Sequence, residues 1–185
     1  WNPREPLNDK LLILPDDDGD GKADRCIVFA DKLHNPTGFE FWNGGVLVAQ
    51  APDILFLKDT DGDGKADLRV RILHGIDSAD THHTANSFIL GPAGHLYFQR
   101  GVFHVTAIET PWGPTFRSTS TGMYRLDLKS HNVTRHFGMG PNPHGNAFDR
   151  WGFQFATDGT SGNGFYIGFP GKGTPKQLYK KKVRP

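Results

Sequence analysis

An acidic segment of nine residues occurs twice in this chain and constrains its fold more than any other feature. Residues 16–24 and 59–67 both read D-x-D-x-D-G-x-x-D, at an offset of 43 residues. A second pattern relates residues 45–50 to residues 94–99 and, more weakly, to residues 152–157. Repeats of about 40 to 60 residues that are rich in short strands are typical of β-propeller blades. The sequence therefore predicts an all-β propeller of four-stranded antiparallel blades.

Apolar alternation and turn residues place the expected strands. In a blade at 34–76 they are residues 37–41, 46–50, 54–58 and 66–73; in a blade at 77–140 they are 87–90, 95–100, 122–128 and 132–137. An incomplete blade at 141–185 has strands at 147–150, 153–157 and 164–168, and a partial blade at 1–33 has strands at 10–14 and 25–30. A closed ring needs at least about four blades. We therefore expect about three and a half blades of a larger ring; the alternative is a small complete β domain.

The acidic segments have the donor pattern of calcium loops. Positions 1, 3, 5 and 9 supply carboxylates, glycine at position 6 permits a sharp turn, and the position 7 carbonyl points inward. The predicted ligands are Asp16, Asp18, Asp20, Asp24, Asp59, Asp61, Asp63 and Asp67, with the backbone carbonyls of Lys22 and Lys65. Four carboxylates within nine residues repel one another unless a cation lies among them. Position 12 is Ile27 or Val70 rather than Glu, so these are not EF-hands. We expect two structural Ca2+ sites, similar to the loops of integrin-type propellers; the alternative is two metal-free acidic turns.

Composition excludes several other classes of protein. The net charge is +1, from 21 basic and 20 acidic residues, so no nucleic-acid partner is expected. No apolar run approaches 18 residues, so no membrane span is expected in this chain. The single cysteine, Cys26, permits no internal disulfide and is expected in the core. The chain opens on Trp1, so we expect that the native start lies elsewhere, and it contains no signal peptide.

Propeller geometry places the links between blades at the end opposite the acidic loops. The links at 34–38, 77–86 and 141–146 carry His34, His82, His83 and His144, four of the nine histidines. Links between second and third strands add Gln50, Arg100 and residues 158–160 to the same end. A polar, histidine-rich mouth is the expected active site, although the histidines could instead cap turns. Neighbouring histidines in an extended strand point to opposite sides, which disfavours a metal shared by His82 and His83.

One of these histidines lies in a familiar context. His83 stands eight residues before Gly91-Pro92-Ala93-Gly94. This arrangement resembles the soluble quinoprotein glucose/sorbosone dehydrogenases, and the resemblance implies that His83 is the base on the sugar hydroxyl. It implies pyrroloquinoline quinone as cofactor, held by Asn142, His144, Asp158, Gly159 and Thr160. The substrate pocket would include His82, Asn86, Gln50 and Arg100. The chain has Pro141, His144 and Thr160 where that family has Arg, Gln and Pro.

The whole chain is even more similar to the planctomycete-type membrane-bound dehydrogenase domain. The similarity rests on residues 80–86, Asp-Thr-His-His-Thr-Ala-Asn, and 148–152, Phe-Asp-Arg-Trp-Gly, and it covers nearly all of 11–168. It implies an extracytoplasmic enzyme, periplasmic or secreted, that oxidises a sugar or alcohol, with a cytochrome c domain or protein as electron acceptor. The alternatives are a calcium-dependent propeller that binds carbohydrate or protein, and a lactonase-like hydrolase.

Overall fold

The computed structural model describes residues 9–160, 164–168 and 181–182, and every regular element in them is a β-strand. All sheets are antiparallel. The first four-stranded sheet has the order β3 (Gly38–Trp42), β4 (Gly45–Gln50), β5 (Asp53–Lys58) and β6 (Leu68–His74). The second has β7 (Asn86–Leu90), β8 (Leu96–Arg100), β11 (Gly122–Leu126) and β12 (Val133–Phe137). The third has β13 (Pro143–Phe148), β14 (Gln154–Asp158), β15 (Gly164–Gly168) and β16 (Lys181–Lys182). Two-stranded sheets are formed by β1 (Asp9–Ile13) with β2 (Ile27–Leu33) and by β9 (Thr106–Ile108) with β10 (Phe116–Ser118).

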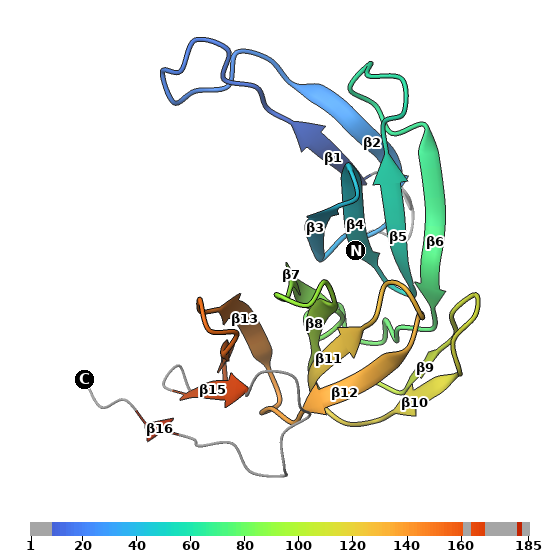
Figure 1. The fold of residues 1–185 in the computed structure, drawn as a ribbon, viewed down its shortest axis with the longest axis vertical. Helices are drawn as coiled ribbons and strands as arrows, with labels where there is room; N and C mark the ends of the chain where they lie inside the picture. The colour runs from blue at the N-terminus through green and yellow to red at the C-terminus, as the bar shows by residue number, and fades with distance from the viewer. Residues whose placement is uncertain (1–8, 161–163, 169–180, 183–185) are drawn as a thin grey trace.

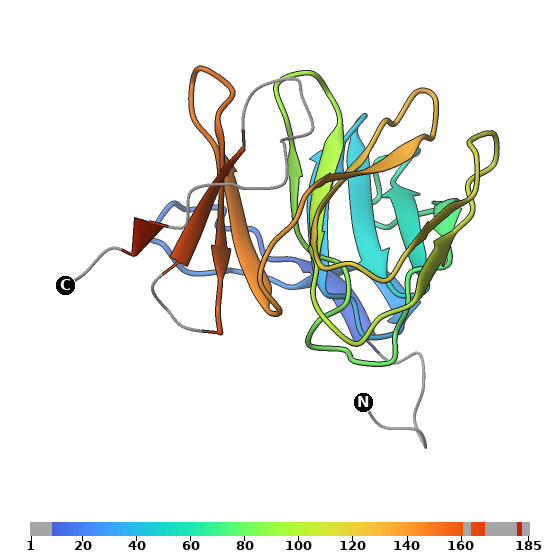
Figure 2. The same cartoon turned by 90° about the horizontal axis from the view of Figure 1, so that it is seen from below.

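The sheets follow one another in an arc, as Figure 1 shows. Figure 2 shows from below how the orange and red sheet of β13 to β15 stands beside the green strands of the second sheet. In the middle of the arc the first strands of the three large sheets lie together, because β7 contacts both β3 and β13. The fold is therefore all-β with propeller-like sheets, as the repeats predict. The described sheets do not close into a ring.

Strand boundaries differ from the expected ones in three informative places. β13 begins at Pro143 rather than at residue 147, so the link before it is shorter than predicted. Asn86 begins β7 instead of ending a link. The long link after β8 contains the β9–β10 hairpin, which was not predicted. In each case pairing with the neighbouring strand in the sequence extends or creates a strand whose own residues carry a weak pattern.

The largest core cluster lies between the first and second four-stranded sheets and includes Leu47, Phe56, Phe98 and Leu126. Alternating apolar side chains from facing sheets interdigitate here, and this packing positions the links at both ends of the strands. Cys26 is exposed, so the prediction that it belongs to the core is wrong. Within the described residues no helix has the length and apolar character needed to cross a membrane.

Candidate functional site

The two acidic loops occupy matching places, between β1 and β2 and between β5 and β6. Both loops fold around their first aspartate. Asp16 accepts hydrogen bonds from the N–H groups of Gly19 (2.7 Å) and Gly21 (3.0 Å). Asp59 accepts the equivalent bonds from Gly62 (2.7 Å) and Gly64 (2.8 Å). These four glycines have positive φ angles of 76–85°, which glycine adopts without a steric penalty.

The other loop carboxylates are also oriented by backbone N–H groups. In both copies the carboxylate at loop position 9 accepts a hydrogen bond from the backbone N–H at loop position 2. The Asp17 N–H donates to Asp24 at 2.7 Å, and the Thr60 N–H donates to Asp67 at 2.8 Å. The Gly62 and Gly64 N–H groups hold the pKa of Asp59 below its usual range, so this carboxylate is charged at neutral pH.

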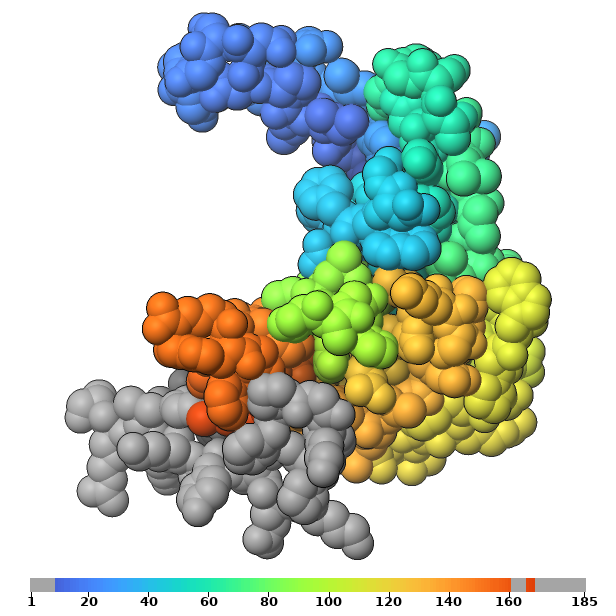
Figure 3. All heavy atoms as spheres, in the orientation of Figure 1, coloured from blue at the N-terminus to red at the C-terminus, as the bar shows by residue number. Residues whose placement is uncertain are grey.

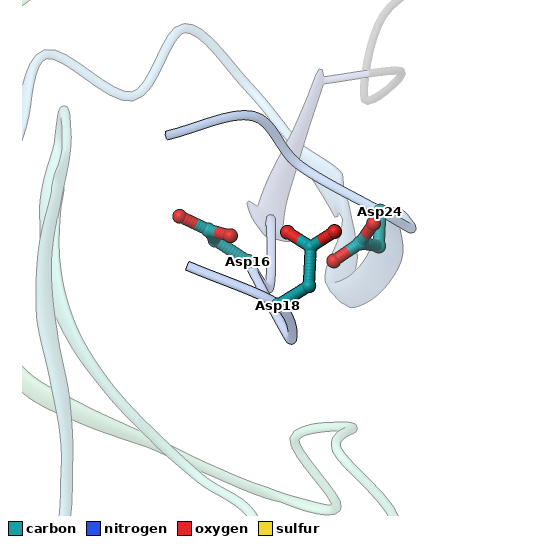
Figure 4. Close-up of side chains that lie close together, drawn as sticks. All are labelled: Asp16, Asp18 and Asp24. Carbon is teal, nitrogen blue, oxygen red and sulfur yellow. The ribbon is translucent and has the colours of Figure 1, made fainter. Parts of the chain in front are cut away.

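The loops bring their carboxylates close enough to share an ion. Oxygens of Asp16, Asp18 and Asp24 lie within 4.8 Å of one another (Figure 4). In the second loop the corresponding group is Asp59, Asp61 and Asp63, also within 4.8 Å. Hard carboxylate oxygens on one exposed loop fit Ca2+, which accepts six to eight oxygen ligands and completes its shell with water. Asp20 and Asp67 lie outside these groups of three, in their respective loops.

At the opposite end of the sheets, backbone hydrogen bonds connect the residues that follow β8 with the 77–86 link and with the 141–146 link. The Gly101 N–H donates to the His83 carbonyl at 2.8 Å, and the Val102 N–H donates to the Pro141 carbonyl at 3.0 Å. A Cβ on Gly101 would lie 2.6 Å from the Pro141 oxygen and 2.7 Å from the His83 ring, so no larger residue fits there. The structure thus brings His83 and the start of the 141–146 link to one place.

His83 forms a hydrogen-bonded pair with Asp80. Its Nδ1 lies 2.8 Å from Asp80 Oδ2, and its side chain is 17% exposed. The bond from His83 lowers the pKa of Asp80. A carboxylate can only accept, so Nδ1 is the donor in this pair, and in a neutral imidazole of this tautomer Nε2 carries the lone pair that can accept a proton. No hydrogen-bond partner of Nε2 is present in the described part of the chain.

The five predicted cofactor-binding residues form a bonded group of their own. The Asn142 N–H donates to Asp158 Oδ2 at 3.1 Å, and the Gly159 N–H donates to the Asn142 carbonyl at 2.7 Å. The Thr160 N–H donates to Asp158 Oδ1 at 2.9 Å, and His144 Nε2 lies 2.9 Å from Asn142 Oδ1. The structure brings these residues together at the ends of β13 and β14, with their polar groups largely bonded to one another.

The four predicted substrate-pocket residues are placed differently from one another. His82 is exposed, whereas Gln50, Asn86 and Arg100 are buried. Gln50 accepts from the His34 N–H at 3.0 Å, and Asn86 donates to the Thr84 carbonyl at 3.0 Å. The Arg100 guanidinium donates to the carbonyls of two residues of its own sheet's links, so it serves the core rather than an open pocket.

A polar cavity of about 560 Å³ opens at the histidine end. It lies between the first and second four-stranded sheets and is lined by residues 34–35, 51, 78–81 and 84. Asp80 therefore borders both the cavity and His83. Such a cavity is of a size that takes a small polar molecule.

Three residues near His83, namely Asp80, Phe103 and His104, were not predicted as site residues from the sequence. His104 is buried, with its Nδ1 3.9 Å from Asp77 and neither ring nitrogen hydrogen-bonded; burial lowers its pKa. The Phe103 ring, 77% exposed, meets the His83 ring edge-on at 5.9 Å. Only the D-x-x-H spacing of Asp80 and His83 could have been recognised beforehand.

Fold and site together define the class of this protein. It is an all-β, propeller-like domain with two acidic loops at one end of its sheets and a His–Asp pair at the other. The chain belongs to the family of the domain of unknown function DUF7133, whose model matches residues 2–181. No curated protein sequence matches it.

Among solved structures, a luciferin-regenerating enzyme determined with an X-ray free-electron laser matches at a TM-score of 0.37 and 12% identity. The match covers 84% of this chain and 64% of that one, so this chain spans less than two thirds of the length of that enzyme.

Proposed function

We propose that the histidine end is the active site of an extracytoplasmic enzyme that acts on a hydroxyl-bearing small molecule, such as a sugar or its derivative. The observation that carries this proposal is the pair of Asp80 and His83, with 2.8 Å between Oδ2 and Nδ1. The acidic loops are proposed as two structural Ca2+ sites at the far end of the same sheets. Calcium loops of this kind suit a calcium-rich compartment outside the cytoplasm.

His83 has the arrangement of a general base. Asp80 fixes the ring tautomer and stabilises the positive charge that develops when Nε2 accepts a proton. Partial burial of the side chain, at 17% exposure, keeps the ring in place while Nε2 has no competing partner in the described residues. The exposed Phe103 ring beside it offers an apolar wall for the non-polar face of a sugar.

The described residues do not fit a quinone cofactor. Pyrroloquinoline quinone carries several carboxylates, for which arginine is the usual partner. Residues 141–146 and 158–160 include neither arginine nor lysine. Arg100 is buried and bonded to carbonyls, and Asp158 would add like charge to the site. No oxidative step is therefore derived from these residues.

The reaction that the described residues do support is hydrolysis of a sugar ester or lactone. In this reaction His83 Nε2 takes a proton from water, and the water oxygen attacks the carbonyl carbon. The bond from that carbon to the leaving oxygen breaks, and His83 returns the proton to the leaving oxygen. Oxidation of a sugar or alcohol with electron transfer to a cytochrome c remains the competing proposal. It is implied by the resemblance at His83 and residues 91–94 and by the resemblance at residues 80–86 and 148–152.

One assay separates these reactions. The protein is loaded with Ca2+ and given sugar lactones and esters, with acid release followed by a pH indicator. In parallel it is given sugars with pyrroloquinoline quinone and a redox dye. We expect acid release, and we expect His83→Ala to lower kcat by about 10²- to 10⁴-fold, the usual contribution of a general base. Asp80→Asn should lower kcat less, because the base remains but its orientation and charge partner are lost.

The matched control is His95→Gln, at the β7–β8 turn on the opposite end of the sheet. It should leave kcat unchanged. If the protein instead shows quinone absorbance and reduces the dye, and His83→Ala abolishes the dye reduction, the reaction is oxidation and the hydrolysis proposal is wrong. Carbohydrate binding without turnover, unchanged by His83→Ala, would instead identify a binding module.

A further inference from the structure

Residues 101–106 join β8 to β9 and pass beside His83. They lead from the second four-stranded sheet to the β9–β10 hairpin on the outer side of the arc, which is yellow in Figure 3. In this segment the apolar side chains face solvent, because Phe103 is 77% exposed and Val105 is 71% exposed. The polar side chains of His104 and Thr106 are buried. The segment therefore reverses the usual pattern of apolar residues inside and polar residues outside.

This reversed arrangement carries two unfavourable local features. Phe103 has a φ angle of 67°, in the left-handed region that residues other than glycine rarely adopt. Both ring nitrogens of His104 and the hydroxyl oxygen of Thr106 have no hydrogen-bond partner among the described residues, although burial makes unpaired polar atoms costly. Costs of this kind persist only where the surrounding structure imposes them, and they are concentrated at functional sites.

Hydrogen bonds fix which side chains of the segment face outward. The His104 carbonyl accepts from the Arg100 guanidinium at 2.9 Å. The Val105 N–H donates to the carboxylate of Asp77, in the link that carries His83. A shift of one residue would bury the apolar side chains and expose the polar ones, but it would break both of these bonds. The exposed side chains therefore keep a fixed position relative to His83.

The two exposed side chains extend an apolar surface away from the proposed base. The Phe103 ring meets the His83 ring edge-on, with 5.9 Å between the ring centroids. Val105 lies two residues further on, so the Cα atoms of Phe103 and Val105 are at most about 7 Å apart. One aromatic ring suffices for the non-polar face of a sugar ring. Val105 therefore provides apolar surface beyond what the sugar itself would occupy.

The charges beside this surface favour an uncharged ligand. Asp77 is bonded to the Val105 N–H, and Asp80 is bonded to His83. Residues 77–86 and 101–106 contain neither lysine nor arginine, and Arg100 is buried and bonded to backbone carbonyls. A carboxylate or phosphate on the ligand would be repelled by the two aspartates and would find no exposed cation in these segments.

We propose that Phe103 and Val105 are specificity-determining residues that bind the apolar acyl group of an uncharged sugar ester. This inference rests on the function proposed above and narrows its substrate class to acylated sugars. The sugar would occupy the polar cavity that Asp80 borders, with Phe103 at the junction between the sugar and the acyl chain and Val105 against the chain. The water oxygen bonds to the acyl carbon, the bond from that carbon to the sugar oxygen breaks, and His83 passes the proton of water to the sugar oxygen.

The first test measures ester hydrolysis by the Ca2+-loaded protein with a pH indicator. Acetyl, butanoyl and hexanoyl esters of glucose are compared below the concentrations at which they aggregate. We expect kcat/KM to rise by about two- to fourfold for each added CH2 group, where about fourfold corresponds to the ~0.8 kcal/mol of full burial. The succinyl ester, which is similar in length to the butanoyl ester but negatively charged, should be poorer than it by at least about tenfold.

Variants separate a role in specificity from a role in folding. Phe103→Asn should not lower the thermal midpoint, because asparagine adopts positive φ more readily than phenylalanine. It should nevertheless remove most of the dependence on acyl length, through KM rather than kcat, and Val105→Ser should reduce this dependence. The matched controls are Phe41→Ser, at a site 69% exposed on β3, and Val70→Ser, at a site 40% exposed on β6. Both should keep the dependence of the parent.

Binding to the His83→Ala protein, followed by calorimetry, distinguishes this inference from the proposed reaction. The hexanoyl ester should bind at least about tenfold more tightly than the acetyl ester, and adding Phe103→Asn should remove the difference. If no ester is hydrolysed but this difference is found, the hydrolysis proposal is wrong and the apolar subsite stands. If His83-dependent hydrolysis is insensitive to acyl length, or Phe103→Asn leaves its dependence intact, the inference is overturned and the hydrolysis proposal stands.

Two further outcomes would overturn the inference. Absence of both hydrolysis and binding would exclude a sugar ester as the ligand. Sedimentation of the protein with phosphatidylcholine vesicles, lost in Phe103→Asn, would assign the exposed side chains to a lipid surface instead of a substrate.

Discussion

The two copies of the acidic repeat have the same loop and opposite surroundings. In both copies the first aspartate accepts N–H groups from positions 4 and 6, and the last accepts the N–H of position 2. Yet Leu55 and Leu57 before the second loop are 4% and 1% exposed, while the corresponding Leu12 and Leu14 are 49% and 58% exposed. Loop structure is therefore set by local sequence, and burial is set by what packs alongside.

The second loop is also tied to its neighbour. The Ala66 N–H at its base donates to the Phe29 carbonyl of β2 at 2.7 Å, and the position of Gly64 lies against the Ile27 side chain. The second loop thus joins two adjacent sheets, whereas the hydrogen bonds of the first loop, at residues 16–24, remain within and beside that loop. Four predictions test this contrast.

The largest expected difference concerns the leucines. Leu57→Ala should lower the free energy of unfolding by about 2–5 kcal/mol, because it removes buried apolar area and leaves a cavity. Leu14→Ala, at the matching position, should change it by less than about 0.5 kcal/mol, because the side chain already faces solvent. Urea unfolding followed by tryptophan fluorescence measures both. Equal losses would show that Leu14 is covered in solution.

Calcium should stabilise both copies. At a free Ca2+ concentration about 100 times the dissociation constant, each site that binds only in the folded state adds about 2.7 kcal/mol to the free energy of unfolding. Calorimetric titration with Ca2+ should give two binding sites, and removal of Ca2+ by a chelator should reverse the increase in the free energy of unfolding. Mg2+ at equal ionic strength is the control, because its smaller, rigid octahedral shell suits these loops poorly. Stabilisation that is equal for both ions would indicate charge screening instead of a calcium site.

The first aspartate of each loop separates metal binding from contacts between sheets. Asp16→Asn and Asp59→Asn should each abolish one of the two calcium sites in the titration, because each removes a charged ligand. The thermal midpoint in calcium should fall further for Asp59→Asn, since only the second loop connects β2 with the β5–β6 hairpin. If Asp16→Asn has the larger effect, the hydrogen bond between Ala66 and Phe29 does not couple the second loop to the stability of the two sheets.

Most of the sheet structure could be predicted because it depends on local patterns. The repeated acidic loop and the alternation of residues such as Leu55 and Leu57 indicate strands, turns and four-stranded sheets without knowledge of the tertiary structure. Tertiary contacts decide the rest. Nothing local shows that Arg100 is buried and bonded to backbone carbonyls, or that Pro143 joins β13 by pairing with Asp158.

The candidate site also has one part that the sequence predicts and another that depends on tertiary contacts. His83 was identified through a motif in the sequence, and the structure adds its partner Asp80 three residues earlier. Phe103 and His104 lie 20 and 21 residues further on, and they reach the site only because the link after β8 returns beside the 77–85 link. A contact made across such a turn leaves no periodic signal in the sequence.

The smallest expected effect lies at position 2 of the loops, where the copies differ in residue type. Asp17 pairs with Arg25, with 2.8 Å between the carboxylate and Nε, while Thr60 donates its hydroxyl to Asp67. The pair with Arg25 lowers the pKa of Asp17, yet both side chains are more than half exposed. Arg25→Ala should therefore leave the urea midpoint unchanged at about 0.15 M salt and lower it slightly at low salt, where screening is weaker. The loop should keep its calcium site, because position 2 holds Asp24 through its N–H group and not its side chain. Loss of calcium binding in Arg25→Ala would show that the first loop depends on its own ion pair, and that the two copies differ in the loop as well as in their surroundings.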